Sequence, residues 1–139
     1  MIVDASGIVA GRMASRIAKL LINGETVIVV NTEKALMVGN KESILEKFRT
    51  RVDGAVKSNP HYGPKYSRIP SQMFKRMVKG MLPKKSRTNE RLLKQLKVYN
   101  SFPKQMEKEK VTHFDGVKYN EKQNHMTLEN IAKLLGGKW

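Results

Sequence analysis

Two glycines four residues apart, Gly7 and Gly11, stand between a short apolar segment and an amphipathic pattern, and Arg12 follows directly. A strand, a glycine turn and a helix that begins near a cation form a common arrangement for holding phosphate. A mononucleotide loop, however, needs a lysine and then a hydroxyl after its last glycine, and Arg12 and Met13 occupy those places here. The three-glycine dinucleotide pattern is absent, and Asn31 stands where a ribose-binding acid is needed. We therefore expect glycines that permit a tight turn and close helix packing, not a nucleotide site.

Residues suited to catalysis are scarce. The histidines at positions 61, 113 and 125 stand in loop-like sequence, without the spacing that places two metal ligands on one helix face. Glu42 and Glu46 are four residues apart, but they belong to the charged side of a helix that we expect to meet solvent. The chain has no cysteine, which excludes disulfides, thiolate nucleophiles and cysteine metal sites. We predict neither an enzyme nor a bound metal, cofactor or small-molecule substrate.

The strongest signal is the distribution of charge. The chain carries 27 Lys and Arg against 12 Asp and Glu, a net charge of +15. Residues 57–106 hold 13 of the basic side chains and a single acid, Glu90, whereas residues 1–56 hold 8 basic and 6 acidic groups. A face that only keeps a protein soluble normally mixes both signs, and like charges gathered on a folded chain repel one another. The segment 57–106 therefore predicts a surface for a polyanion such as a nucleic acid.

Length and composition indicate one globular domain. A chain of 139 residues that is 40% hydrophobic can bury a core of its own. Its longest apolar runs have four residues, at 27–30 and 35–38, which is too short to span a membrane, and its first residues do not follow the pattern of a secretion signal. We expect a single domain over residues 1–139, in the cytoplasm and without membrane contact.

Hydrophobic periodicity predicts an α/β arrangement in the first half of the chain. A short strand at 2–3 precedes a helix whose apolar face runs from 13 to 21. The β-branched run at 26–30 lacks alternation, as does a strand covered on both faces in a parallel sheet. A third strand is expected at 35–38, and Asn40 then begins a helix with apolar residues from 44 to 52.

The second half begins with an arm, at about 53–69, whose prolines and glycines indicate an extended, irregular path. Pro70 and Ser71 begin a helix with one apolar stripe and a basic opposite face. The stripe comprises Met73, Phe74, Met77, Val78, Met81 and Leu82, and it is expected to be core; the basic face carries Lys75, Arg76 and Lys79.

The remaining elements are a second basic helix at about 87–96, a short strand at 97–100 and a last helix at about 127–136. Thr127 is expected to cap that last helix, and Gly136 with Gly137 to close it. Residues 103–126 are polar and weakly patterned.

The arm also has a composition suited to RNA. Its sequence "HYGPKYSR" alternates His61, Tyr62 and Tyr66 with Lys65 and Arg68. Cations bind phosphates and aromatic faces stack on unpaired bases, which is how proteins hold single-stranded or irregular RNA. Together with the basic face of the helix that follows, the arm predicts one continuous RNA-binding surface.

Five spaced segments give a more specific indication: "AGRMAS" at 10–15, "VIVVNTEKALMVGNK" at 27–41, "NPHYGP" at 59–64, "VKGMLPKKS" at 78–86 and "LKVY" at 96–99. In this order they resemble the L-thirteen family of large-subunit ribosomal proteins, in its archaeal and eukaryotic branch. The resemblance covers about residues 2–100, and the final "IAKLLGGKW" is similar to that branch's C-terminal helix. It implies a three-layer α/β/α fold with a small four-stranded parallel sheet, extended by the basic loops and helices at 57–97.

The resemblance also implies a non-enzymatic place on the solvent side of the large subunit, bound to large-subunit rRNA from early assembly and beside other ribosomal proteins. It carries RNA contact onto Arg12, Asn40, Lys41, His61, Gly63, Lys65, Arg68, Arg76, Lys79, Gly80, Lys84, Lys85 and Tyr99. The charge and aromatic patterns add Arg16, Tyr62, Tyr66, Lys75, Arg87, Arg91 and Lys97. Two positions depart from the family, which commonly has a glycine after the basic residue that follows "MLPKKS" and another two residues after the "KVY" tyrosine. Here Arg87 is followed by Thr88 and Asn89, and Ser101 takes the second place.

Three functions remain open at this point. The leading hypothesis is a structural rRNA-binding protein of the large ribosomal subunit that neutralises phosphates where RNA helices approach one another. The alternative is a regulatory RNA-binding protein that acts outside the ribosome, because composition alone does not separate these two. A phosphate-dependent enzyme comes third, given the incomplete loop motif.

Overall fold

The parallel sheet brings together strands that are far apart in the chain. The computed structural model describes residues 1–54, 56–84, 86–106, 111–114 and 123–139. Within them, β1 (Ile2–Asp4), β2 (Val27–Val30), β4 (Leu96–Val98) and β5 (Val111–Thr112) form a sheet in the order β4-β2-β1-β5. Every pairing is parallel, with Val29 opposite both Val3 and Val98. The α/β class and the four-stranded parallel sheet are confirmed.

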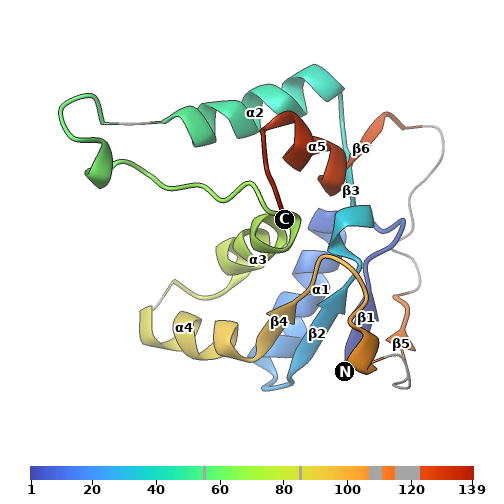
Figure 1. Cartoon of the computed structure of the whole chain (residues 1–139). Coiled ribbons are helices and arrows are strands. Elements are labelled where there is room, and N and C mark those ends of the chain that lie inside the picture. Colours follow the sequence, from blue (N-terminus) through green and yellow to red (C-terminus); the bar gives the residue numbers. More distant parts are fainter. Residues whose placement is uncertain (55, 85, 107–110, 115–122) are drawn as a thin grey trace.

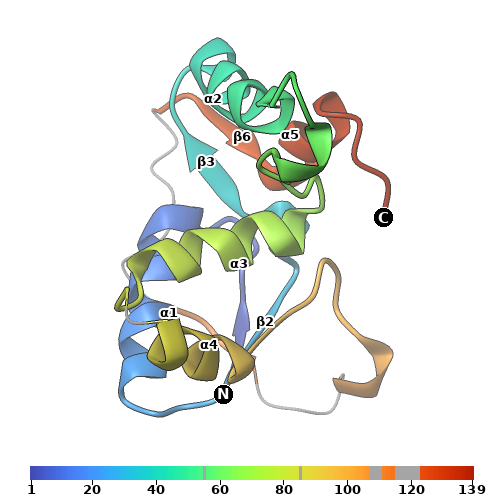
Figure 2. The ribbon, with the colours of Figure 1, turned by 90° about the vertical axis from the view of Figure 1, so that its left-hand side faces the viewer.

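Strand β2 is buried on both faces, which explains why its sequence is apolar without alternation. Val27 and Val29 belong to the same buried cluster as the apolar face of helix α1 (Ala10–Ile22), and Val30, on the other side of the strand, is also fully buried. Figure 2 shows α1 on one side of the strands and the segment 99–106 on the other, with the 3-10 turn η3 (Lys104–Met106). A strand covered on both sides has no solvent face for polar residues.

The run at 35–38 forms a strand, but it does not join the parallel sheet. Strand β3 (Leu36–Val38) pairs antiparallel with β6 (His125–Thr127) in a separate two-stranded sheet. After β2 the chain turns away at Asn31, whose φ of 56° is left-handed, and passes through the 3-10 turn η1 (Thr32–Lys34). The Thr32 hydroxyl donates a hydrogen bond of 2.7 Å to the backbone oxygen of Tyr99, which holds this turn beside β4.

The glycine-containing turn is occupied by the protein's own carboxylate. Asp4 Oδ1 accepts hydrogen bonds from the Ser6 backbone N–H at 3.0 Å, the Ser6 hydroxyl at 2.8 Å and Asn31 Nδ2 at 3.0 Å. Gly7 has a φ of +68°, so the turn itself favours glycine there, but Gly11 lies inside α1 with no atom within 4 Å of an added Cβ. Close packing at Gly11 is therefore not found. A carboxylate at this end of the strand disfavours a bound phosphate.

Besides α1, the described residues form four α-helices: α2 (Lys41–Asp53), α3 (Pro70–Met81), α4 (Ser86–Lys94) and α5 (Leu128–Leu134). Pro70 begins α3 as expected, and the Ser71 N–H is satisfied by Asn100 Oδ1 at 2.9 Å. The predicted cap of the last helix is confirmed, because the Thr127 hydroxyl accepts from the Asn130 N–H at 3.2 Å. In the part of the chain that the structure describes, no helix is both long and apolar enough to cross a membrane.

Helix α3 packs on α1 through most of the predicted apolar stripe. Met73, Phe74 and Val78 are buried in one cluster with α1 and the sheet. Met77 is only partly buried, and Met81, in the last turn, is 44% exposed. Leu82, directly after the helix, is 4% exposed and belongs to the same cluster. The stripe is thus core at four of its six residues, and Met77 and Met81 lie at its edge.

The arm leaves α2 after Asp53, projects away from the body and returns at Pro70 (Figure 1). It contains the 3-10 turn η2 (Pro60–Tyr62). The C-terminal residues pack against its base, because an added Cβ on Gly137 would lie 2.5 Å from the backbone oxygen of Arg68. Glycine at this position permits the close approach.

Replacing Phe74 with Ala should destabilise the fold by about 3–5 kcal/mol, because a fully buried ring leaves a cavity between α3 and α1. Urea unfolding followed by circular dichroism measures the change. Met81→Ala is the matched control on the same helix, and its effect should stay within about 0.5 kcal/mol. Similar losses from both variants would contradict the described packing of α3.

A pH series should reveal the hydrogen-bonded state of Asp4. Burial alone would raise the pKa of its carboxyl, but hydrogen bonds from Asn31 and Ser6 outweigh burial, and the pKa lies below its ordinary value. A lowered pKa in the folded state contributes stability above the unfolded pKa of about 3.9 and loses it as the pH falls through the folded pKa.

Asp4→Asn should therefore unfold more easily than the parent at neutral pH, by about 1 kcal/mol. The difference in unfolding free energy should shrink as the pH falls below about 4, where the unfolded carboxyl is protonated first, and it should be lost once the pH has passed the lower folded pKa. Urea unfolding of both proteins across this range makes the comparison. A difference that persists unchanged in acid would show that these hydrogen bonds do not favour the carboxylate.

Candidate nucleic-acid interface

A basic groove lies where the arm meets helices α3 and α4. It encloses about 260 Å³ and is lined by Lys65, Tyr66, Ser67, Gln72, Met73, Lys75, Arg76, Lys79 and Leu93. Its cations come from the arm (Lys65) and from one side of α3 (Lys75, Arg76 and Lys79), while Met73 and Leu93 supply apolar surface. The basic groove thus joins two segments that the charge distribution singled out.

The amphipathic pattern of α3 places its cations. Because Phe74 and Val78 must face the core, the helical period turns Arg76 and Lys79 outward, and both are exposed. Lys75 is half-buried, with its chain along the groove wall. The basic side of α3 is therefore a consequence of where its apolar side packs.

The cations of the basic groove have no carboxylate partner among the described residues. The ion pair that the described residues do contain lies outside the groove and joins Lys133 to Glu129 within α5. Glu90, the only acid in segment 57–106, lines a neighbouring hollow of about 400 Å³ with Lys79, Gly80 and Lys84. Uncompensated cations in a concave surface attract phosphates.

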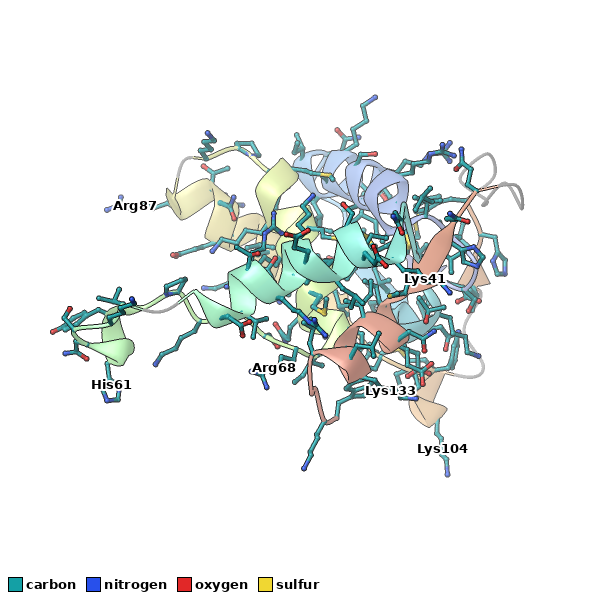
Figure 3. All side chains as sticks on the ribbon, turned by 90° about the horizontal axis from the view of Figure 1, so that it is seen from above. Lys41, His61, Arg68, Arg87, Lys104 and Lys133 are labelled. Atoms are coloured by element: carbon teal, nitrogen blue, oxygen red, sulfur yellow. The ribbon has the colours of Figure 1, made fainter. Side chains whose placement is uncertain are left out.

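The arm presents an exposed aromatic ring beyond the groove. Asn59 organises the turn there, since its Oδ1 accepts from the His61 N–H at 3.1 Å and its backbone oxygen accepts from the Tyr62 N–H at 3.2 Å. Tyr62 is 83% exposed, and Figure 3 shows His61 projecting at the far end of the arm. Such a ring can stack on an unpaired base.

Tyr66 has a different environment from Tyr62. Its ring packs edge-on against Phe48 of α2, with 6.5 Å between the ring centroids, and the Arg76 guanidinium lies 4.1 Å from its centroid. Arg51 of α2 also approaches it, with Nη1 donating a hydrogen bond of 3.1 Å to the Tyr66 hydroxyl. The sequence predicted that Tyr66 stacks on an RNA base, whereas in the structure its ring contacts Phe48, Arg51 and Arg76.

The other residues predicted to contact RNA are spread over the molecule. Lys84, Arg87 and Arg91 are exposed near or on α4, whereas Lys41, at the start of α2, lies on the opposite half in Figure 3. Lys85 lies outside the described residues. The rest are Arg12 and Arg16 on α1, Asn40 before α2, Gly63 and Arg68 in the arm, Lys97 on β4, and Tyr99 directly after it.

Two of these residues have partners within the protein. The Arg16 guanidinium lies 5.7 Å from the centroid of the Phe114 ring. Tyr99 is half-buried, and its backbone N–H donates to the Val29 oxygen at 2.8 Å, which continues the pairing of β4 with β2. The structure brings Lys65, Tyr66, Lys75, Arg76 and Lys79 together in one groove. RNA contact by the other residues of the predicted set stays a prediction for each of them.

Sequence reasoning missed three residues that shape the interface. Arg51 lies in the charge-balanced part of the chain, so its charge did not stand out. Asn89 is 9% exposed and ties α4 to the end of α3. Its Nδ2 donates to the backbone oxygens of Pro83 at 3.1 Å and Lys79 at 3.4 Å. Asn100 caps the start of α3. No local sequence pattern predicts the hydrogen bonds of Asn89 and Asn100, because their partners belong to other elements of the fold.

Comparison with known proteins gives one consistent result. A family model described as "Ribosomal protein L13" matches residues 1–105. The large ribosomal subunit protein uL13 of Thermoplasma acidophilum is 40% identical over 137 residues, which cover 98% of both chains. The protein of the same name from Methanosphaera stadtmanae is 39% identical over 139 residues, 99% of this chain and 98% of the relative. That from Methanocaldococcus jannaschii is 34% identical over 141 residues, with coverage of 99% and 98%.

Proposed function

We infer that the chain, which belongs to the ribosomal protein L13 family, is a structural, non-enzymatic constituent of the large ribosomal subunit that binds large-subunit rRNA. The observation that carries the RNA contact is the basic groove, whose four cations have no acidic partner among the described residues. Membership of the large subunit places the protein in the cytoplasm. We take residues 1–139 to act as one rRNA-binding domain, because buried residues from β1 to α5 form a single cluster.

The basic groove would bind RNA chiefly by charge neutralisation. Each phosphate that meets a lysine or arginine releases a condensed counterion, which is the main source of affinity at moderate salt. The groove wall on α3 is rigid, since the same helix is anchored in the core by Phe74 and Val78. Cations held at fixed spacing favour folded RNA in which phosphates are also held at fixed spacing.

The arm would supply a second kind of contact. Tyr62 is exposed on a turn that Asn59 organises, away from the body, and its ring can stack on a base that the RNA fold leaves unpaired. Backbone contact is sequence-tolerant, whereas a stacked base requires an unpaired nucleotide at the right place. Groove and arm together would select one region of the rRNA, with neighbouring ribosomal proteins on the remaining surface.

Sedimentation of cell lysate tests the placement on the ribosome. The protein should travel with large subunits and leave them only when high salt dissociates the particles, because charge contacts weaken with ionic strength. A protein found mainly in light fractions with messenger or small RNA would instead support the regulatory alternative.

The basic groove can be tested by changing Lys65, Lys75 and Lys79 together to Gln. Binding to protein-free large-subunit rRNA should weaken, and the slope of log affinity against log salt should fall by about two to three, since each phosphate contact contributes about 0.7 to 0.9. Filter binding over a salt series measures both. The fold should persist, because these side chains line the groove and Gln keeps helix propensity.

A matched control removes the same charge elsewhere. Lys19, Lys34 and Lys138 are exposed and do not line the groove, so their joint replacement with Gln should change affinity and slope much less. Equal losses from the two triple variants would mean that only net charge matters, and the groove would then not be the binding site.

A further inference from the structure

We propose that Tyr66 holds Arg51 and Arg76 as a two-arginine clamp for the phosphate backbone of RNA at the base of the arm. The proposal rests on the rRNA-binding function above and deepens it. It adds Arg51 to the binding residues and gives Tyr66 a positioning role in place of the base contact that its sequence context suggested.

The first step is that the Tyr66 ring is itself fixed. It packs against the hydrophobic core and meets the edge of Phe48, which is 2% exposed. Phe48 belongs to α2, whereas Tyr66 belongs to the arm, so this contact also secures the returning end of the arm against the body. A ring held this way can orient flexible side chains around it.

Arg76 is oriented by two contacts. Its guanidinium lies 4.1 Å from the Tyr66 centroid, a stacking distance, and its Nη2 donates a hydrogen bond of 3.0 Å to the backbone oxygen of Lys65. Stacking uses the face of the guanidinium and leaves N–H groups along its edge. Arg76 lines the basic groove, so this edge is beside the groove lysines.

Arg51 reaches the same ring from α2. Its Nη1 donates to the Tyr66 hydroxyl at 3.1 Å, and its guanidinium carbon lies 5.8 Å from the ring centroid. The Arg51 side chain is exposed, and no carboxylate among the described residues pairs with it or with Arg76. Two guanidinium groups around one ring repel each other, and an anion between or beside them would relieve that repulsion.

RNA phosphate is the ligand that this arrangement suits best. Each guanidinium carries five N–H donors, and the contacts described use one donor of each, which leaves donors for the bidentate contact that arginine makes with phosphate oxygens. The clamp continues the basic groove, because Arg76 and Tyr66 line both. A phosphate chain could therefore pass from the lysines of α3 to Arg51 without leaving a basic surface.

The decisive variant is Arg51→Gln, measured by filter binding to protein-free large-subunit rRNA over a salt series. Affinity should fall roughly tenfold at fixed salt, the effect of losing one charge-assisted contact, and the salt slope should fall by about one. Arg49→Gln is the matched control, since Arg49 is also exposed on α2 but lines a hollow with Glu42, Glu46 and Asp53. It should change affinity less than about twofold.

Tyr66→Phe tests the positioning role. The ring remains for packing and for Arg76, but the hydroxyl that accepts from Arg51 is lost, so binding should weaken by a smaller factor than in Arg51→Gln. In an Arg51→Gln background the same change should have no further effect, because the hydroxyl acts only through Arg51. Thermal unfolding of each variant checks that the fold is retained.

The outcomes separate the clamp from the function on which it rests. If the parent protein does not bind the rRNA, the proposed function fails. If the parent binds and Arg51→Gln equals Arg49→Gln, the clamp is wrong while the function stands. A loss from Tyr66→Phe that persists without Arg51 would mean that the hydroxyl touches RNA directly. If polyglutamate displaced the rRNA from the parent but not from Arg51→Gln, the clamp would serve an acidic protein instead.

Discussion

The packing of helix α3 against α1 and the parallel sheet is the contact on which the rest of the molecule depends. Phe74 and Val78 anchor it, and a helix anchored on one side must present its other side in a defined direction. The arm enters at one end of α3, Asn89 ties α4 to its other end, and its outer side forms a wall of the basic groove. The packing of α3 in the core therefore fixes where the groove cations of this helix lie.

A groove of this kind is costly to the isolated protein and useful to its complex. Repulsion among uncompensated cations lowers the stability of the compact state, and an RNA that binds only the folded chain raises it again by mass action. Contacts with Tyr66 offset part of this cost, because cation–π and hydrogen-bond contacts stabilise guanidinium groups that no described carboxylate pairs. Arg76 stacks on Tyr66, and Arg51 is held by the hydroxyl of the same ring. Segment 1–56, which supplies α1 and two strands of the main sheet, is nearly balanced in charge.

Most of the fold could be predicted from the sequence where the signal is local. The helices beginning at Pro70 and after Thr127 were predicted with their boundaries, because apolar period and capping residues act within one or two turns. The pairing of β3 could not be predicted, since an apolar run has the same appearance in either sheet. Strand β5 has two residues, too few for any periodicity, and is defined only by its pairing with β1.

The candidate site likewise has features that local sequence predicts and features that depend on tertiary contacts. Composition by itself predicted a polyanion surface in the segment 57–106, and the period of α3 determined that its cations oppose its apolar stripe. Both signals are local, because charge and helical spacing are properties of neighbouring residues. Only the tertiary structure decided that Tyr62 is exposed while Tyr66 is enclosed by Phe48, Arg51 and Arg76. Phe48 and Arg51 lie 18 and 15 residues before Tyr66, and Arg76 lies 10 residues after it. The role of a ring depends on which of these distant groups the fold places against it.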